Sequence, residues 1–428
     1  MDALFDSLRS GSWLTRERMQ LVALAVLAAS LAGLIWLVAA SDGLNDRLGR
    51  PLGTDFSNVY AAGTYVLEGR PAAPFDPAAQ YAREQAIFGQ ATPFYGWHYP
   101  PFFLALAALL ALMPYTLALA LWQGTTLGIY LWAVRFIFLS FRGPRSGSPE
   151  SITTIETMDS GPRADARDRN DNTIFPLLLA LAFPAVFVNL GHGHNGFLTA
   201  ALFAAALLAL DRRPVLAGIL FGCLAYKPQF GVLIPLVLAA SGRWRAFAAA
   251  AAAVAIFALA VTLAFGPDVW RAFIASTEFT RTVVLEAGDT GWHKIQSVFS
   301  WVRMWGGGVT LAYIVQGVVT LAVAAALVRL WRSTAAFPRK AAALLIGTVL
   351  ATPYSLDYDL MLLAPAIALL AADGFARGFY AWEKSALAAL WIVPLIARSI
   401  AEATLIPLAV PAMLAAFVLL LRDHRPPG

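Results

Sequence analysis

The stretch "MQLVALAVLAASLAGLIWLVAA", residues 19–40, decides the class of fold because it contains no charged residue. Roughly 20 consecutive apolar residues are enough to span a bilayer as a helix. The run is too long, and lies too far into the chain, for the core of a signal peptide, and no convincing small-residue cleavage site follows it. We therefore predict a retained transmembrane helix.

The rest of the chain repeats this pattern. Of its 428 residues, 59% are hydrophobic and only 13% are charged, whereas a soluble protein has about 25% charged residues. The composition predicts an all-α polytopic membrane protein, folded as a single domain over residues 1–428, with about twelve crossings. The further apolar runs lie near residues 100–113, 115–140, 174–190, 196–210, 214–241, 245–265, 309–331, 341–353, 360–372, 385–398 and 405–421.

Basic residues recur between the apolar runs and give the chain a net charge of +5. The positive-inside rule places such residues in the cytoplasm. Their bias is therefore information about orientation and does not indicate a nucleic-acid partner. The lone cysteine, Cys223, excludes an intrachain disulfide. The basic positions are Arg16, Arg18, Arg135 to Arg145, Arg212, Arg213, Arg243, Arg245, Arg329 to Lys340 and Arg422 to Arg425.

Three polar segments interrupt the apolar runs. Residues 41–99 form the first non-cytoplasmic loop, in which we expect two short amphipathic helices, "SNVYAAGTYVLEG" and "DPAAQYAREQAIFG". Residues 143–173 have the Gly, Ser, Pro and mixed-charge composition of a disordered loop. Residues 266–308 should include an interfacial helix with Trp270 at the head-group level. Loops of this length between helices are usually functional.

The number of crossings between His98 and Arg142 stays open at this level. The positive-inside rule requires an odd number, but the apolar residues there are broken at Met113–Pro114. Either one long kinked helix crosses once, or the loop 143–173 is outside. The choice also decides the face on which residues 191–196 lie.

Asp55 lies soon after the first helix, with Asn58 and Tyr60 nearby. A carboxylate at this place could act as a catalytic group. It could equally be a helix N-cap in "TDFSNVYAAG", because Asp is a favoured capping residue.

Polar groups at the ends of later apolar runs are further candidates. His98 and Tyr99 lie in "FYGWHYPPFF" (94–103), where His98 could bind an anion, or where the aromatic residues could simply mark the membrane interface. His192 and Asn195 lie in "NLGHGHNGF" (189–197), where two His and two Asn could bind a metal or contact sugar hydroxyls, although no carboxylate accompanies them.

Lys227, in "LAYKPQFG" (224–231), interrupts a long uncharged run. A lysine there needs a partner or an anionic ligand unless it snorkels to an interface. In "GWHKIQS" (291–297), His293 and Lys294 could hold a phosphate. The last group comprises Tyr354, Asp357 and Asp359, where one Asp could cap the following helix.

Taken in order, these motifs resemble the integral-membrane glycosyltransferases of the GT-C superfamily, and most of all glycosyltransferase family 87. Each motif is weak alone, and the resemblance rests on their order and spacing. One departure is His192, which stands where a glutamine is usual. The resemblance covers most of residues 54–250 and part of 350–366, in the stretches "DFSNVYAAGTYVLEGRPAAPFD", "YPPFFLALAALLALMPYTLALALW", "GHGHNGFLTAALFAAALLAL", "RRPVLAGILFGCLAYKPQFGVLIPLVLAASGRWRA" and "YSLDYDLMLLAPA".

The resemblance implies a GT-C-like bundle whose donor is a polyprenyl-phosphate sugar, often mannose, and whose acceptor is a hydroxyl of a glycan or glycolipid. It implies that the acid of the first non-cytoplasmic loop, Asp55, is the catalytic base. Cationic donors should stabilise the leaving phosphate, with Lys227 and His98 ranked before His293 and Lys294. No cofactor or metal is required. Ala-rich helices and compact loops suggest a bacterial inner membrane, with the site on the periplasmic face.

Two other functions fit the same sequence. A transporter or lipid flippase for an envelope-glycan precursor would share the helices and Lys227, but would not need Asp55 in a loop. The absence of a convincing internal repeat weakens this alternative. The chain could also be a non-catalytic partner of a larger glycan assembly.

Overall fold

A computed structural model describes residues 2–140 and 174–422. Within these ranges the chain is helical, and its only β-structure consists of three isolated bridges. The first polar segment and its surroundings contain α1 (Asp2–Ser10), α2 (Arg16–Ala39), α3 (Thr54–Leu67), α4 (Pro77–Phe88), α5 (Leu104–Ala111) and α6 (Tyr115–Ser140). The central part contains the helix 174–181, α8 (Pro184–His192), α9 (Gly196–Ala209), α10 (Pro214–Cys223), α11 (Pro228–Gly231), α12 (Leu233–Ala240), α13 (Trp244–Phe265) and α14 (Asp268–Phe279). The remainder contains α15 (Val298–Met304), α16 (Val309–Arg332), α17 (Phe337–Ala351), α18 (Leu363–Arg377), α19 (Glu383–Thr404) and α20 (Ala409–Leu421).

Every apolar run of the sequence is helical, but the helices differ in length. Among the described residues, six helical segments are long and apolar enough to cross a membrane, or seven if the bent pair 174–181 and α8 is one span. Five shorter apolar helices accompany them. The chain is therefore a multi-pass membrane protein by length and composition, and the number of about twelve crossings stays a prediction.

The run 214–241 was expected to be continuous, and the structure breaks it at Lys227. Proline explains the break, because Pro228 lacks a backbone N–H and disfavours helical geometry at the residue before it. A 3₁₀ turn over Leu224–Tyr226 precedes Lys227, and α11 follows it. This interruption directs Lys227 into the protein.

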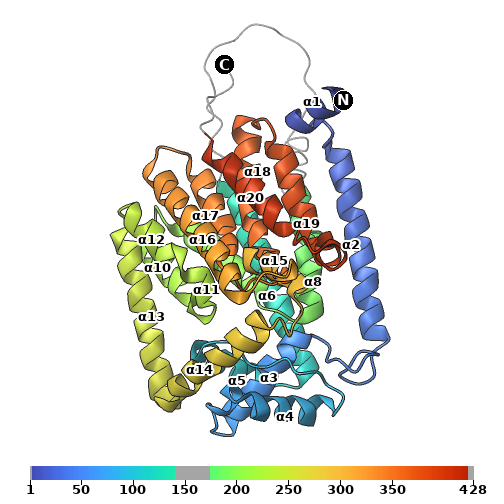
Figure 1. The fold of residues 1–428 in the computed structure, drawn as a ribbon, viewed down its shortest axis with the longest axis vertical. Coiled ribbons are helices and arrows are strands. Elements are labelled where there is room, and N and C mark those ends of the chain that lie inside the picture. Colours follow the sequence, from blue (N-terminus) through green and yellow to red (C-terminus); the bar gives the residue numbers. More distant parts are fainter. Residues whose placement is uncertain (1, 141–173, 423–428) are drawn as a thin grey trace, which may run out of the picture.

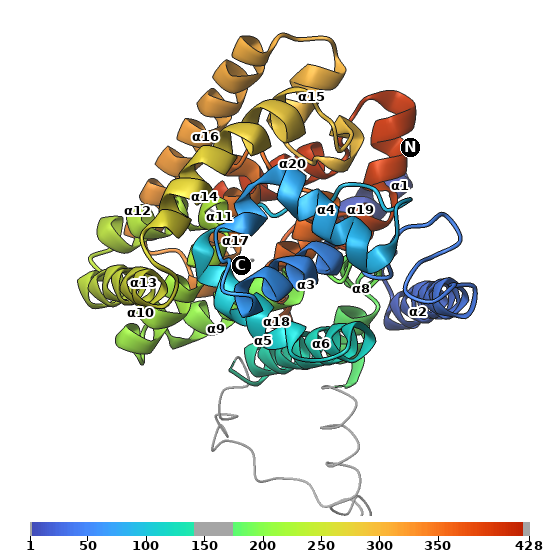
Figure 2. The same ribbon diagram turned by 90° about the horizontal axis from the view of Figure 1, so that it is seen from below.

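The two ends of the molecule are built from different helices (Figures 1 and 2). Helices α3, α4, α5 and α14 gather at one end, which we call the loop end, whereas α1 and both ends of the described chain lie at the other. We call that second end the basic end. There Arg243, at the start of α13, lies over the ring of Trp331, at the end of α16 (5.2 Å).

Both amphipathic helices expected in residues 41–99 are present as α3 and α4, and the helix expected in 266–308 is present as α14. Its place at the membrane interface stays a prediction. Trp270 of α14 contacts the ring of Phe102 (5.2 Å between centroids) and donates a hydrogen bond to Thr262 (2.9 Å). The loop predicted over 143–173 lies outside the described residues.

One candidate membrane span lies between His98 and the end of α6. Helix α5 packs closely against α3, so that a Cβ on Gly63 would lie 2.1 Å from the carbonyl oxygen of Ala107. It therefore stays at the loop end, and α6 with 26 residues, about 39 Å long, is the candidate span of this stretch. This satisfies the odd number required by the positive-inside rule. The motif 191–196 lies on the side of Asp55, because Gly193 contacts Phe56.

Candidate active site

Asp55 lies in the first turn of α3 and does not cap it. The N-cap is Gly53, whose φ of +70° favours glycine, and no side chain caps this helix. The alternative that Asp55 caps the helix is therefore wrong, because the N-cap lies two residues earlier, at Gly53. The Tyr115 hydroxyl fixes the residues that precede α3 by donating a hydrogen bond to the carbonyl of Leu52 (2.5 Å).

The carboxylate of Asp55 combines an unpartnered oxygen with a raised pKa. Its Oδ2 atom is buried and has no hydrogen-bond partner among the described residues. Burial raises the pKa of Asp55 from 3.8 to about 7, and Asp357 and Asp359 contribute in the same direction, while Lys227 and the Tyr358 hydroxyl oppose them. A carboxylate with an unpartnered oxygen and a pKa near neutrality has the properties of a general base.

The turn between α8 and α9 is fixed against the start of α3. Gly193 has a φ of +65°, and a Cβ at this position would lie 2.6 Å from the Cβ of Phe56. The same turn brings His192 Nδ1 within 2.7 Å of the Thr54 hydroxyl. His192 therefore supports the first turn of α3, in which Asp55 lies.

Lys227 is 4% exposed and forms a buried ion pair. Its Nζ atom lies 2.6 Å from Asp359 Oδ1 and 3.3 Å from His194 Nε2. The alternative that Lys227 snorkels to an interface is wrong, because the break at Pro228 turns it inward. Asp359 also accepts a hydrogen bond from the backbone N–H of Leu356 (3.0 Å) through its second oxygen. One oxygen of Asp359 therefore neutralises Lys227, and the other caps a turn.

Tyr358 packs against both His194 and Lys227. Its ring stacks on His194 with 3.6 Å between centroids, and Lys227 Nζ lies 5.6 Å from the ring centre. Asn189 anchors its backbone by donating to the Tyr358 carbonyl (2.9 Å). The contact of Asn189 Oδ1 with Gly196 leaves no room for a larger residue at that glycine.

A second group of charges surrounds Asp357. Arg398, on α19, lies 3.0 Å from Asp357 Oδ2. Lys294 is brought nearby because residues 295–296 pair with residues 355–356: Ile295 and Leu356 form a bridge, and the Gln296 N–H donates to Ser355 (2.7 Å).

The Lys294 ammonium has no ion pair or hydrogen bond among the described residues. Burial and the neighbouring Arg398 lower its pKa, whereas Asp357 and Asp55 act in the opposite direction. Lys294 and Arg398 therefore form a cationic pair near both aspartates, which an anion would stabilise.

Other residues expected in the site lie at its edge or apart. Tyr99 and Tyr354 lie close enough to feel the charge of Asp55. His98 instead contacts the Thr280 hydroxyl (2.9 Å), and burial lowers its pKa to about 4, so it is neutral at pH 7. His98 therefore cannot act as a cation there. Burial also lowers the pKa of His293, which lies beside Lys294.

Asn195 precedes α9 and is 2% exposed, and its Oδ1 atom has no hydrogen-bond partner among the described residues. No group of three or more His, Cys, Asp or Glu in the described part of the chain could hold a metal ion. The alternative that residues 94–103 merely mark the interface fails for Trp97, which is 4% exposed and packs on Phe75 and Phe103.

Sequence reasoning missed three residues of this region. Arg398 could have been found, because a charge inside an apolar helix is costly and usually functional. Tyr358 carried no signal beyond its two flanking aspartates. Glu84 is fully buried and accepts the backbone N–H groups of Tyr95 and Gly96 (3.0 Å each), so it shapes the loop before Tyr99. Burial raises the pKa of Glu84 to about 7.

The comparison with protein families gives one match. The model of glycosyltransferase family 87 matches residues 97–353, more than half of the chain. The chain belongs to glycosyltransferase family 87. No curated protein and no solved structure matches it. The matched region of this family 87 protein includes Tyr99, His192, Lys227 and Lys294, whereas Asp55 and Arg398 lie outside it. Membership makes the chain a glycosyltransferase and favours this function over transport.

Proposed function

We propose that the protein transfers a hexose such as mannose from a polyprenyl phosphate to a hydroxyl group of a glycan or glycolipid acceptor, with inversion. Asp55 would act as the general base. The observation that carries this proposal is the Asp55 carboxylate, with a raised pKa and one unpartnered oxygen at the end of the molecule opposite the basic end. The positive-inside rule makes that end non-cytoplasmic, which in a bacterial inner membrane is the periplasmic face.

The reaction needs one carboxylate. Asp55 takes the proton from the acceptor hydroxyl while the oxygen of that hydroxyl forms a bond to the anomeric carbon, from the side opposite the phosphate. The bond between the anomeric carbon and the phosphate oxygen breaks, and polyprenyl phosphate leaves with one additional negative charge. Because the phosphate is a competent leaving group, a second carboxyl, as normally used in glycoside hydrolysis, is not needed.

Lys294 and Arg398 are better placed than Lys227 and His98 to stabilise that leaving phosphate. Lys227 is already neutralised by Asp359 at 2.6 Å, and His98 is uncharged at neutral pH. Lys294 has no ion-pair partner within the described ranges, and Arg398 could exchange Asp357 for the phosphate. We assign Lys227 to the positioning of Asp359 and Tyr358. Cationic groups fixed at the site of developing charge lower the barrier most.

The test uses the purified full chain alone with a synthetic polyprenyl-phosphate mannose and a glycan acceptor. Wild-type protein should transfer the sugar, and Asp55→Asn should lower kcat by about a hundredfold or more while remaining folded. Asp42→Asn, in the same polar segment and exposed, is the matched control and should keep full activity. Undiminished transfer by Asp55→Asn contradicts the role of Asp55. No transfer by wild type with any sugar donor favours a non-catalytic partner of a larger assembly.

A further inference from the structure

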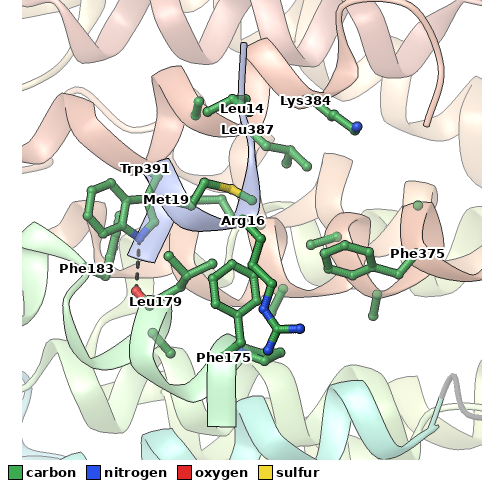
Figure 3. Close-up of a pocket in the computed structure, with 18 of the residues that line it drawn as sticks. Leu14, Arg16, Met19, Phe175, Leu179, Phe183, Phe375, Lys384, Leu387 and Trp391 are labelled. Carbon is green, nitrogen blue, oxygen red and sulfur yellow. Dashed lines mark hydrogen bonds between the residues drawn. The ribbon is translucent and has the colours of Figure 1, made fainter. Parts of the chain in front are cut away.

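A large apolar cavity lies at the basic end, far from Asp55. Its volume is about 1310 Å³, and it lies between α2, the helix 174–181, α18 and α19. Figure 3 shows aromatic and aliphatic side chains along its walls, with the charged side chains Arg16 and Lys384 among them. The cavity exists because α2 stands away from the bundle: of the 24 residues of α2, only Ala23 is buried.

The depth of the cavity matches one leaflet. It follows α18 from Ala364 to Ala376, which corresponds to about 18 Å of helix. The hydrocarbon core of a bilayer is about 30 Å thick, so this depth is slightly more than half of it. An acyl chain of a lipid in the leaflet at the basic end therefore fits the cavity in length and in chemistry.

The cavity is separate from the candidate active site. Leu119 of α6 contacts Gly53 and Gly193, at the level of Asp55, whereas Val134 and Phe138 of the same helix line the cavity. The cavity residue of α6 nearest to Leu119 is Tyr130, eleven residues further along the helix, or about 16 Å away. A ligand in the cavity would thus not contact the carboxylate of Asp55.

Two cations on the rim of the cavity, Arg18 and Lys384, have no acidic partner in the described part of the chain. Arg18 donates to the Trp13 carbonyl (3.0 Å), and Lys384 lies over the ring of Phe379 (5.2 Å). Neither forms an ion pair within residues 2–140 and 174–422. The acids nearest Lys384 in the chain do not neutralise it, because Asp373 and Glu383 both bind Arg377 (2.6 Å each).

Helix α1 closes the rim at the membrane surface. The Trp382 N–H donates to the Arg9 carbonyl (2.7 Å), and Ser385 Oγ donates to the Leu8 carbonyl (2.6 Å). Trp382 has a φ of +70°, a conformation costly for a tryptophan, so this junction is held by its contacts. Leu4 and Phe5 on α1 are 66% and 54% exposed, as expected for a helix lying in the interface.

We propose that this cavity is a binding site for an anionic glycerophospholipid of the leaflet at the basic end. The acyl chains fill the space between α2 and the bundle, and the phosphate lies against Arg18 and Lys384. Anionic head groups are attracted to such juxtamembrane cations, and the chains supply the apolar contacts that α2 lacks. The inference does not depend on the sugar-transfer reaction.

The test measures lipid retention by native mass spectrometry of the full chain in neutral detergent. Delipidated protein is titrated with dioleoyl phosphatidylglycerol or with dioleoyl phosphatidylcholine. The wild type should prefer phosphatidylglycerol by about tenfold. Arg18→Gln/Lys384→Gln should abolish the preference, whereas Arg329→Gln/Arg332→Gln, exposed at the same end on α16, should keep it.

A second pair of variants tests the space itself. Ala388→Phe fills the cavity and should reduce retention of both lipids, whereas Ala325→Phe, on the exposed side of α16, should not. Equal losses in the two charge variants would show a nonspecific basic surface and overturn the proposal. Displacement of phosphatidylglycerol by polyprenyl phosphate, one molecule for one, would also overturn it by assigning the cavity to the donor tail.

Discussion

Lys227 lies near Asp55 and Lys384 lies on the rim of the apolar cavity, and the two lysines differ in what surrounds them. Lys227 is 4% exposed, pairs with Asp359 at 2.6 Å and contacts a histidine and a tyrosine. Lys384 is half-buried, contacts one aromatic ring and has no acidic partner in the described chain. A buried charge must be paired to be tolerated, whereas an exposed one can remain available to a ligand. The same residue type is thus paired within the candidate active site and lacks an acidic partner, in the described chain, on the rim of the cavity.

The largest expected effect that separates the two lysines is on stability. Lys227→Met leaves Asp359 buried without a partner and should lower the free energy of unfolding by about 3–5 kcal/mol. Lys384→Met should change it by less than about 1 kcal/mol. Thermal unfolding in neutral detergent measures both. Lys227→Met/Asp359→Leu should recover part of the loss, and equal stability of the two single variants would contradict the comparison.

The next largest effect is on kcat, through the positive charge that stabilises the leaving phosphate and that Lys227 does not supply. If Lys294 and Arg398 hold the leaving phosphate, Arg398→Gln should lower kcat by about a hundredfold and raise KM less, because the charge develops in the transition state. Arg329→Gln on α16 is the control and should match the wild type. Steady-state kinetics with the polyprenyl-phosphate sugar decide this, and a rise in KM alone would limit Arg398 to ground-state binding.

The pH dependence gives a smaller, graded effect. Because burial raises the pKa of Asp55 to about 7, kcat/KM should rise about tenfold per pH unit below pH 7 and level off above it. The residual activity of Asp55→Asn should not follow this profile. A profile of the wild type that is flat between pH 5.5 and 8 would rule out Asp55 as the base that limits the rate.

The same raised pKa has a consequence for stability. Between pH 3.8 and about 7 the folded protein binds more protons at Asp55 than the unfolded chain, so its stability falls as pH rises through this window. The Asp55→Asn variant has no carboxyl to ionise, so it does not lose stability as the pH rises. At pH 8 it should unfold at a higher temperature than the wild type. An inactive but more stable variant would separate the chemical role of Asp55 from any structural role.

The smallest effect tests the packing that brings the two halves of the site together. Gly193→Ala combines a φ of +65° with a clash against Phe56, whereas Gly43→Ala has a φ of +60° and open space. Both should cost about 1 kcal/mol for the backbone, and Gly193→Ala should lose more. Only Gly193→Ala should also lower sugar transfer, because it displaces His192 from Thr54. Equal losses of stability would mean that Phe56 moves aside freely.

Local sequence patterns predicted the helices well, since an apolar run of sufficient length forms a helix wherever the bilayer receives it. They also predicted α3, α4 and α14 within polar segments. They failed at Lys227, where the apolar run continued but Pro228 interrupted the helix. Arg398 was missed although its charge lies inside an apolar helix, and its pairing with Asp357, 41 residues earlier in the chain, appears only in the structure.

The sequence by itself determined that this is a multi-pass helical membrane protein of glycosyltransferase family 87, and it drew attention to Asp55 and Lys227. Only the tertiary structure decided which charges are paired, that His98 is neutral and that Lys294 remains available. The physical reason is that burial and partners set the pKa and the charge of a side chain, and both depend on contacts between residues far apart in the chain.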